Sequence, residues 1–210
     1  MAVKCFVPPE CPTISCQWTD TRDICSSCLD MKLLSWVRFT WDLSKLPPIV
    51  PELPEHYQIA PATKEDENEL RKVFSSAFVL DPTWNPAMGE VMLTIQSWLD
   101  HAFTSEKSTC LALRHGSRII GASVLLLDPH ADNHLAPGPC ISMEYRNRGF
   151  GTRLLESSFK LLRESGLSRA IGIAMENAPV ARFLYTKFGG IAVPADFPRL
   201  VAAQPFVPAG

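Results

Sequence analysis

Apolar residues between positions 56 and 201 follow two spacings, one typical of helices and one typical of strands. A spacing of three or four residues predicts helices at about 63–80, 87–103, 150–165 and 177–188. Alternating or short continuous apolar runs predict strands at about 56–61, 109–113, 119–127, 169–174 and 191–201, with a further strand that leads up to Met143. This succession predicts an α/β or mixed α+β domain with a sheet core.

Residues 1–55 do not share this alternation. Trp, Phe and Val are frequent in residues 33–43, which favours an added strand or a packing arm. Four prolines follow within residues 47–54, and at about 3.1 Å per residue such a segment is a stiff connector on the order of 25 Å long. We therefore predict an N-terminal extension and linker at 1–55 and a compact domain at 56–210.

Cysteines concentrate at the start of the chain, where five of the seven are Cys5, Cys11, Cys16, Cys25 and Cys28. The odd total and the lack of a visible signal peptide argue against a disulfide framework. Cys25 and Cys28 have the spacing of half a zinc site, but a zinc ribbon pairs two such knuckles, so we predict no metal. A redox pair is disfavoured because no strand precedes Cys25. We favour a poorly ordered leader, or translation that begins at Met31.

The composition is 46% hydrophobic and 20% charged, which excludes wholesale disorder. A formal net charge of −2 gives no electrostatic reason to bind nucleic acid or an acidic membrane. The longest apolar stretch, residues 119–127, is far shorter than the roughly 20 residues that span a bilayer. We therefore expect a cytoplasmic protein without nucleic-acid or membrane partners.

A glycine-rich loop, Arg-Asn-Arg-Gly-Phe-Gly-Thr at residues 146–152, precedes the third predicted helix. Glycines let the backbone pass close to a ligand, and the N–H groups at a helix start carry partial positive charge, so the loop suits a phosphate or pyrophosphate. Leu154 stands where the Rossmann fingerprint needs its third glycine, and Thr152 follows Gly151 without the lysine of a Walker A motif. The alternative is a tight surface turn with solvated arginines.

Residues 141–190 resemble the core of the GNAT superfamily, the acyl-CoA-dependent N-acyltransferases. The family signature Arg/Gln-x-x-Gly-x-Gly/Ala is matched by Arg146, Gly149 and Gly151, and Asn177, Tyr185 and Phe188-Gly189 follow in the family's order. The resemblance implies a central mixed sheet flanked by helices, and acetyl-CoA as the acyl donor. Met143 stands where the family usually has a proline, which is tolerable because backbone groups act there.

The resemblance also implies a role for each matching residue. The strand before the loop would pair its backbone with the pantetheine arm, the loop amides would hold the pyrophosphate, and Asn177 would touch the pantetheine, unless it only caps a helix. Tyr185 matches the acid that protonates the leaving thiolate; its alternative is a tyrosine packed on the sheet with its hydroxyl in solvent. The implied cofactor-binding residues are Ile141, Ser142, Met143, Arg146, Asn147, Arg148, Gly149, Phe150, Gly151, Thr152 and Asn177.

The general base has no clear candidate, because Gly172 stands where several relatives keep a Glu. Glu144, Glu176, Asp128 and His134 are candidates by proximity in sequence only, and we assign none. The leading prediction is an N-acetyltransferase that moves an acetyl group from acetyl-CoA to a primary amine of a small molecule or peptide by direct attack. The alternatives are a non-catalytic acyl-CoA-binding sensor or interaction module, and a nucleotide-binding protein. The sequence leaves homodimer formation open.

Overall fold

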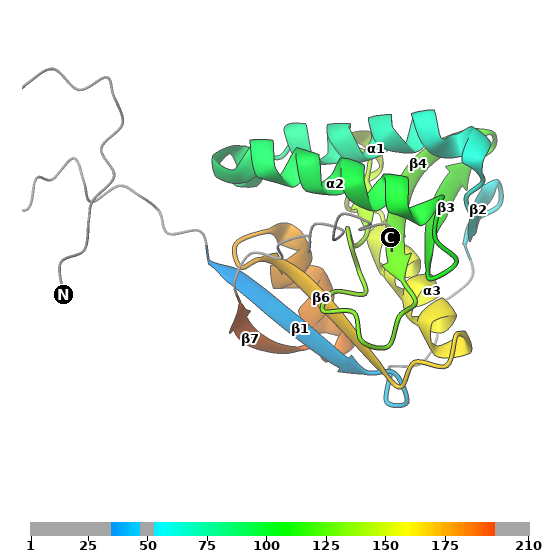
Figure 1. Ribbon diagram of the computed structural model, residues 1–210. Helices are drawn as coiled ribbons and strands as arrows, with labels where there is room; N and C mark the ends of the chain where they lie inside the picture. Colours follow the sequence, from blue (N-terminus) through cyan, green and yellow to red (C-terminus); the bar gives the residue numbers. More distant parts are fainter. Residues whose placement is uncertain (1–34, 47–52, 196–210) are drawn as a thin grey trace, which may run out of the picture. The chain divides into compact units, whose positions relative to one another are not determined.

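The computed structural model describes residues 35–46 and 53–195 (Figure 1). Its strands are β1 (Trp36–Asp42), β2 (Tyr57–Pro61), β3 (Ser108–His115), β4 (Arg118–Leu126), β5 (Cys140–Ile141), β6 (Arg169–Met175) and β7 (Ile191–Ala195). Its α-helices are α1 (Glu67–Val79), α2 (Met88–Ala102) and α3 (Phe150–Glu164). Short helical segments are η2 (Lys64–Asp66), η3 (Pro82–Ala87), η4 (Met143–Tyr145), the π-helix η5 (Val180–Tyr185) and η6 (Thr186–Phe188).

The strands form two antiparallel sheets, with the orders β2-β3-β4-β5 and β6-β1-β7. Residues just before β5 connect them: the Leu126 N–H donates to His134 O at 3.0 Å, and the His134 N–H donates to Ile171 O at 2.8 Å. The Ile171 N–H in turn donates to His134 Nδ1 at 3.0 Å. The sheets therefore meet beside His134. No ladder pairs β5 with β6 among the described residues.

Alternation along β3 divides the core between two faces of the four-stranded sheet. Cys110 and Ala112 pack in one cluster with the apolar faces of α1 and α2, whereas Leu111 and Leu113 pack in the other with α3. This is the arrangement that period-two side chains produce when both faces of a strand are covered. The mixed α+β class that the sequence predicted is confirmed.

The strand β1 has a larger role than the sequence suggested. It pairs antiparallel with β6 on one side and β7 on the other, so it is the central strand of its sheet. Its Phe39 and Trp41 are almost fully buried, which explains why this aromatic segment docks here. The compact part of the chain thus includes residues ahead of the proline-rich connector, and the boundary expected at His56 falls inside it.

Two element ends differ from the expectation. β5 ends at Ile141 rather than Met143, because Met143–Tyr145 turns into η4. The last helix begins later than Asn177, with Pro179 as the N-cap of η5, because proline disfavours a helical residue before it. The leader, zinc and redox hypotheses concern cysteines that lie outside the described residues.

Candidate active site

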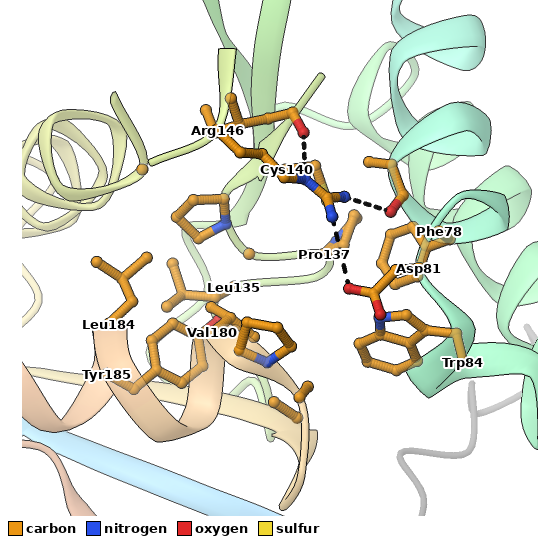
Figure 2. A pocket seen from close by; sticks show the side chains of 18 of the residues that line it. Phe78, Asp81, Trp84, Leu135, Pro137, Cys140, Arg146, Val180, Leu184 and Tyr185 are labelled. Atoms are coloured by element: carbon orange, nitrogen blue, oxygen red, sulfur yellow. Dashed lines mark hydrogen bonds and ion pairs between the residues drawn. The ribbon is translucent and has the colours of Figure 1, made fainter. Parts of the chain in front are cut away.

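A cavity of about 560 Å³ opens where β5 and β6 diverge. Its walls come from β5 and the glycine loop, from α1, η3 and α2, and from η5 together with Ile173 and Ala174 of β6. Figure 2 shows Val180, Leu184 and Tyr185 on one side of this space and Phe78, Asp81 and Trp84 on the other. Segments that are far apart in the sequence therefore face one another across one site.

The glycine loop presents backbone donors to the cavity. Gly149 is the N-cap of α3 with φ of 81°, a left-handed conformation that favours glycine, and no side chain caps the helix there. The Arg153 N–H donates to Gly149 O at 3.2 Å. The N–H groups of the three residues before Arg153 have no acceptor within the helix. Gly149, Gly151 and Thr152 line the cavity, so the start of α3 lies at its wall, and backbone donors of this kind suit an anion.

The Arg146 side chain is turned into the cavity wall. Its Nε donates to Ile141 O at 3.1 Å and its Nη2 to Ala77 O at 2.6 Å, while Nη1 lies 3.6 Å from Asp81 Oδ2 (Figure 2). The guanidinium therefore holds the C-terminal end of α1 against β5 and faces a carboxylate. The structure gives it a positioning role beside the loop.

The remaining predicted cofactor residues divide into two groups. Ile141, Met143 and Asn147 also line the cavity. The others are not among the described lining residues: Ser142 is buried, Arg148 lies over the ring of Tyr145, Phe150 packs on Tyr57 in the core, and Asn177 is exposed. Asn177 also stands two positions before the N-cap of η5, so it does not cap that helix.

The main chain of Ile141 points into the cavity. Ile141 stands opposite Gly121, and the next residue, Ser142, donates its N–H to Ile120 O at 2.9 Å. Because pairs in an antiparallel ladder alternate between bonded and non-bonded, the N–H and C=O of Ile141 point away from β4. The Ile141 carbonyl oxygen accepts a hydrogen bond from Arg146 Nε, and the Ile141 N–H is directed toward the cavity.

Tyr185 lines the cavity and is tightly packed, and its hydroxyl is buried rather than in solvent. Only 1% of the residue is exposed, and its ring makes edge contacts with Phe39 and Trp41 at centroid distances of 5.2 and 5.0 Å. Gly138 passes so close to the hydroxyl that a Cβ there would overlap with it. Burial raises the pKa of Tyr185, which keeps the phenol protonated at neutral pH.

Few charged or nucleophilic groups line the cavity. Among the described lining residues, Asp81 and Arg146 are the only charged side chains, and they pair with each other. Cys140 also lines it, but burial raises the pKa of its thiol to about 12, so no thiolate is present at neutral pH. Of the four base candidates by sequence, Glu144 pairs with Arg118, Asp128 pairs with Lys107, and none lies in the described lining.

Sequence reasoning missed an aromatic wall on the side of α1 and α2. Trp84 lies 4.8 Å from Phe78 and 6.1 Å from Trp36 between ring centroids, and Trp98 lines the same part of the cavity. The helical period does place Phe78 on the buried face of α1. No pattern could bring in Trp36, because it arrives with β1.

Comparison with known proteins identifies the family. The sequence model of the acetyltransferase (GNAT) family matches residues 67–189, which is more than half of the chain. The chain belongs to this family. The resemblance carried by the glycine loop is thereby confirmed. No protein among the curated ones matches the chain.

Solved structures agree with the family at the level of the fold. A GCN5-related N-acetyltransferase from Kribbella flavida has a TM-score of 0.50 and 13% identity, over 77% of this chain and 56% of that one. A Drosophila protein has a TM-score of 0.52 and 13% identity, over 77% and 48%. AAC(6')-Iy, in complex with a bisubstrate analogue of CoA and acetylneamine, has a TM-score of 0.50 and 12% identity, and the match covers 64% of this chain and 90% of that one. This chain therefore spans about half the length of the first two.

Neither a metal centre nor a membrane span is found in the part of the chain that the structure describes. No group of three or more His, Cys, Asp and Glu side chains there is arranged to hold a metal ion. No helix within residues 35–46 or 53–195 combines the length and apolar character that crossing a bilayer requires.

Proposed function

We propose that this chain transfers an acetyl group from acetyl-CoA to a primary amine of a small molecule or peptide. One observation carries the proposal: backbone donors at the start of α3 and a buried, protonated Tyr185 line the same cavity. The first suits a pyrophosphate and the second suits a leaving thiolate. Acetyl-CoA is the acyl donor that the family implies.

The residues present fit the coenzyme. The amides of residues 147–152 would hold the pyrophosphate, and the open space beside Gly149, where an added Cβ would meet nothing within 4 Å, leaves room for it. Arg146 would hold β5 against α1 rather than contact the pyrophosphate directly. When bound, acetyl-CoA supplies an acyl carbon activated by its thioester.

The chain's own groups then account for the transfer. A neutral amine nitrogen attacks the carbonyl carbon, the carbon–sulfur bond breaks, and the amine gives up one proton. The Ile141 N–H would stabilise the negative charge that develops on the carbonyl oxygen. Tyr185 would give its hydroxyl proton to the departing sulfur and recover one from the amine. Direct attack is favoured because the cavity offers no thiolate to carry the acetyl group.

A non-catalytic acyl-CoA-binding module is the second candidate. It is favoured by one observation: within the described cavity lining, the single carboxylate, Asp81, pairs with Arg146, so no free carboxylate acts as a base. The two candidates share the coenzyme site and differ only in turnover. Cytoplasmic location stays a prediction.

Two measurements test the proposal. Titration calorimetry with CoA, acetyl-CoA and ATP should show binding of the first two, and thiol release from acetyl-CoA should depend on an added amine. Tight binding without thiol release for any amine would favour the non-catalytic module. Binding of ATP in preference to CoA would contradict both candidates.

The role of Tyr185 is tested by Tyr185→Phe, with Tyr57→Phe as the matched control. The control also removes one phenolic hydroxyl, and the ring at position 57 keeps its contact with Phe150. Residue 57 lies outside the described cavity lining. We expect Tyr185→Phe to lower the rate of thiol release about 100-fold with little change in acetyl-CoA affinity, because only the proton donor is lost. Equal rates for Tyr185→Phe and the wild type would show that another group supplies the proton.

A further inference from the structure

The half of the cavity that faces Tyr185 is aromatic and apolar. Trp84 is buried and packs edge-on against Phe78, with an interplanar angle of 67°, and Trp36 tilts onto it from β1. Val91, Ile95 and Trp98 extend this surface along α2. Figure 2 shows Trp84 and Phe78 across the cavity from Tyr185. We call Trp36, Phe78, Trp84 and Trp98 the aromatic wall.

The charges around the aromatic wall cancel. Asp81 is 9% exposed, and its carboxylate faces the Arg146 guanidinium, which is itself fixed by two backbone carbonyls. A second ammonium group or a carboxylate on the acceptor would lose its water here, and the only charged side chains in the described lining already pair with each other. The wall therefore disfavours polyamines, aminosugars and amino acids, and favours an uncharged body.

We propose that the acceptor is a primary amine carried on a flat, uncharged aromatic body, with Trp84 and Phe78 as the side chains that select it. The inference rests on the proposed acetyltransferase function and names its substrate class. Stacked and edge contacts between aromatic rings would hold the body, and its short aliphatic arm would direct the amine toward Tyr185. The cavity of about 560 Å³ also holds the coenzyme site, so the body of the acceptor must be small.

The same wall supplies the deprotonated amine that direct attack requires. An ammonium ion transferred from water to an apolar pocket has a lowered pKa, because burial disfavours its charged form. An acceptor that lies against Trp84 and Phe78 is thus biased toward the neutral amine before reaction. Transfer to such an acceptor therefore does not need a free carboxylate in the described lining to remove the proton from the amine.

A comparison of kcat/KM between different amines, measured on the wild-type protein, tests the inference. Thiol release from acetyl-CoA is measured with 2-phenylethylamine and 1-naphthylmethylamine, and with spermidine, glycinamide and a lysine-containing peptide. We expect kcat/KM to be at least about tenfold higher for the two aromatic amines. A preference for spermidine or for the peptide would overturn the inference and leave the proposed function standing. Binding of acetyl-CoA with no release for any amine would overturn both.

Variants of the wall locate the selectivity. Trp84→Ala should raise KM for 2-phenylethylamine by about tenfold or more with acetyl-CoA affinity unchanged. Trp84→Phe should keep KM for this amine close to the wild-type value, because an aromatic face is kept. Leu93→Ala on α2 is the matched control, since Leu93 is 71% exposed and lies outside the described lining. Equal KM values for Trp84→Ala and Leu93→Ala would overturn the assignment of Trp84. The amine ranking on the wild type decides the substrate class whether or not Trp84→Ala folds.

Discussion

Gly151→Ala should make the protein more stable and leave the binding of the coenzyme close to that of the wild type. Gly151 is the second residue of α3 and lines the cavity. A Cβ added there would lie 3.5 Å from Leu184 Cδ2 and 3.9 Å from Ile141 Cγ1, which are ordinary van der Waals contacts. Because alanine is favoured over glycine in a helix by about 0.5–1 kcal/mol, the free energy of unfolding should rise by up to that amount.

The coenzyme should bind almost as well as it does in the wild type. The family signature accepts alanine as well as glycine at this position, and the added Cβ makes only ordinary contacts with Leu184 and Ile141, so the amides of the first turn stay accessible to the pyrophosphate. We expect the dissociation constant for acetyl-CoA to change by less than about twofold, which is less than about 0.4 kcal/mol in binding free energy. Stability thus rises while affinity stays level.

Gly89→Ala is the matched control for this prediction. Gly89 is the second residue of α2, is exposed, and has nothing within 4 Å of an added Cβ. It should gain similar stability and keep wild-type affinity. Thermal unfolding and calorimetric titration with acetyl-CoA measure the two effects, and a gain of 1 kcal/mol corresponds to about 2–4 °C in Tm for a domain of this size. A clear loss of affinity in Gly151→Ala but not in Gly89→Ala would contradict the assignment of Gly151 to the signature position that accepts alanine.

Three further substitutions test the site. Gly138→Ala forces a methyl group into the Tyr185 hydroxyl and should lower the free energy of unfolding by about 1–3 kcal/mol; an unchanged urea midpoint would contradict the close approach. Arg146→Gln leaves the Asp81 carboxylate without its cation and should cost about 3 kcal/mol in the same assay, and a cost near zero would remove its positioning role. Burial lowers the pKa of His134 below its usual 6.5, so the unfolded chain binds the proton more readily. Stability should be constant above about pH 6.5 and fall as the pH drops toward the folded pKa, and His134→Gln should flatten this slope; an equal slope in the variant would assign it to another group.

The local parts of the fold could be predicted because they depend on neighbours in sequence. The apolar period of Leu70, Val73 and Phe74 marks the buried face of α1, and the turn at His115-Gly116 marks the hairpin of β3 and β4. The position of β1 could not be predicted in this way. Its partners are more than 100 residues away in the chain, and an aromatic strand does not reveal which sheet edge it joins.

The candidate site divides in the same manner. The glycine loop and Tyr185 were found from a short motif and its order along the chain. The direction of the Arg146 side chain was not, because it is decided by Ala77 and Asp81, which fold next to it from α1 and the turn after it. Asn177 stays a prediction without a cavity contact among the described residues. The aromatic wall was missed because its four residues come from four separate elements, β1, α1, η3 and α2.

Residues outside the family match determine much of the chemistry of this site. Trp41 of β1 donates its Nε1–H to Tyr185 O at 3.3 Å, and its ring lies 3.1 Å from where a Cβ of Gly172 would be. A side chain at position 172 would press on this ring, which would have to shift by a few tenths of an ångström to make room. The strand that brings Trp36 to the aromatic wall therefore also restricts the space in which a carboxylate base could stand. Both effects favour an acceptor whose amine loses its proton by burial, because apolar packing takes up the space of a group that would otherwise accept the proton.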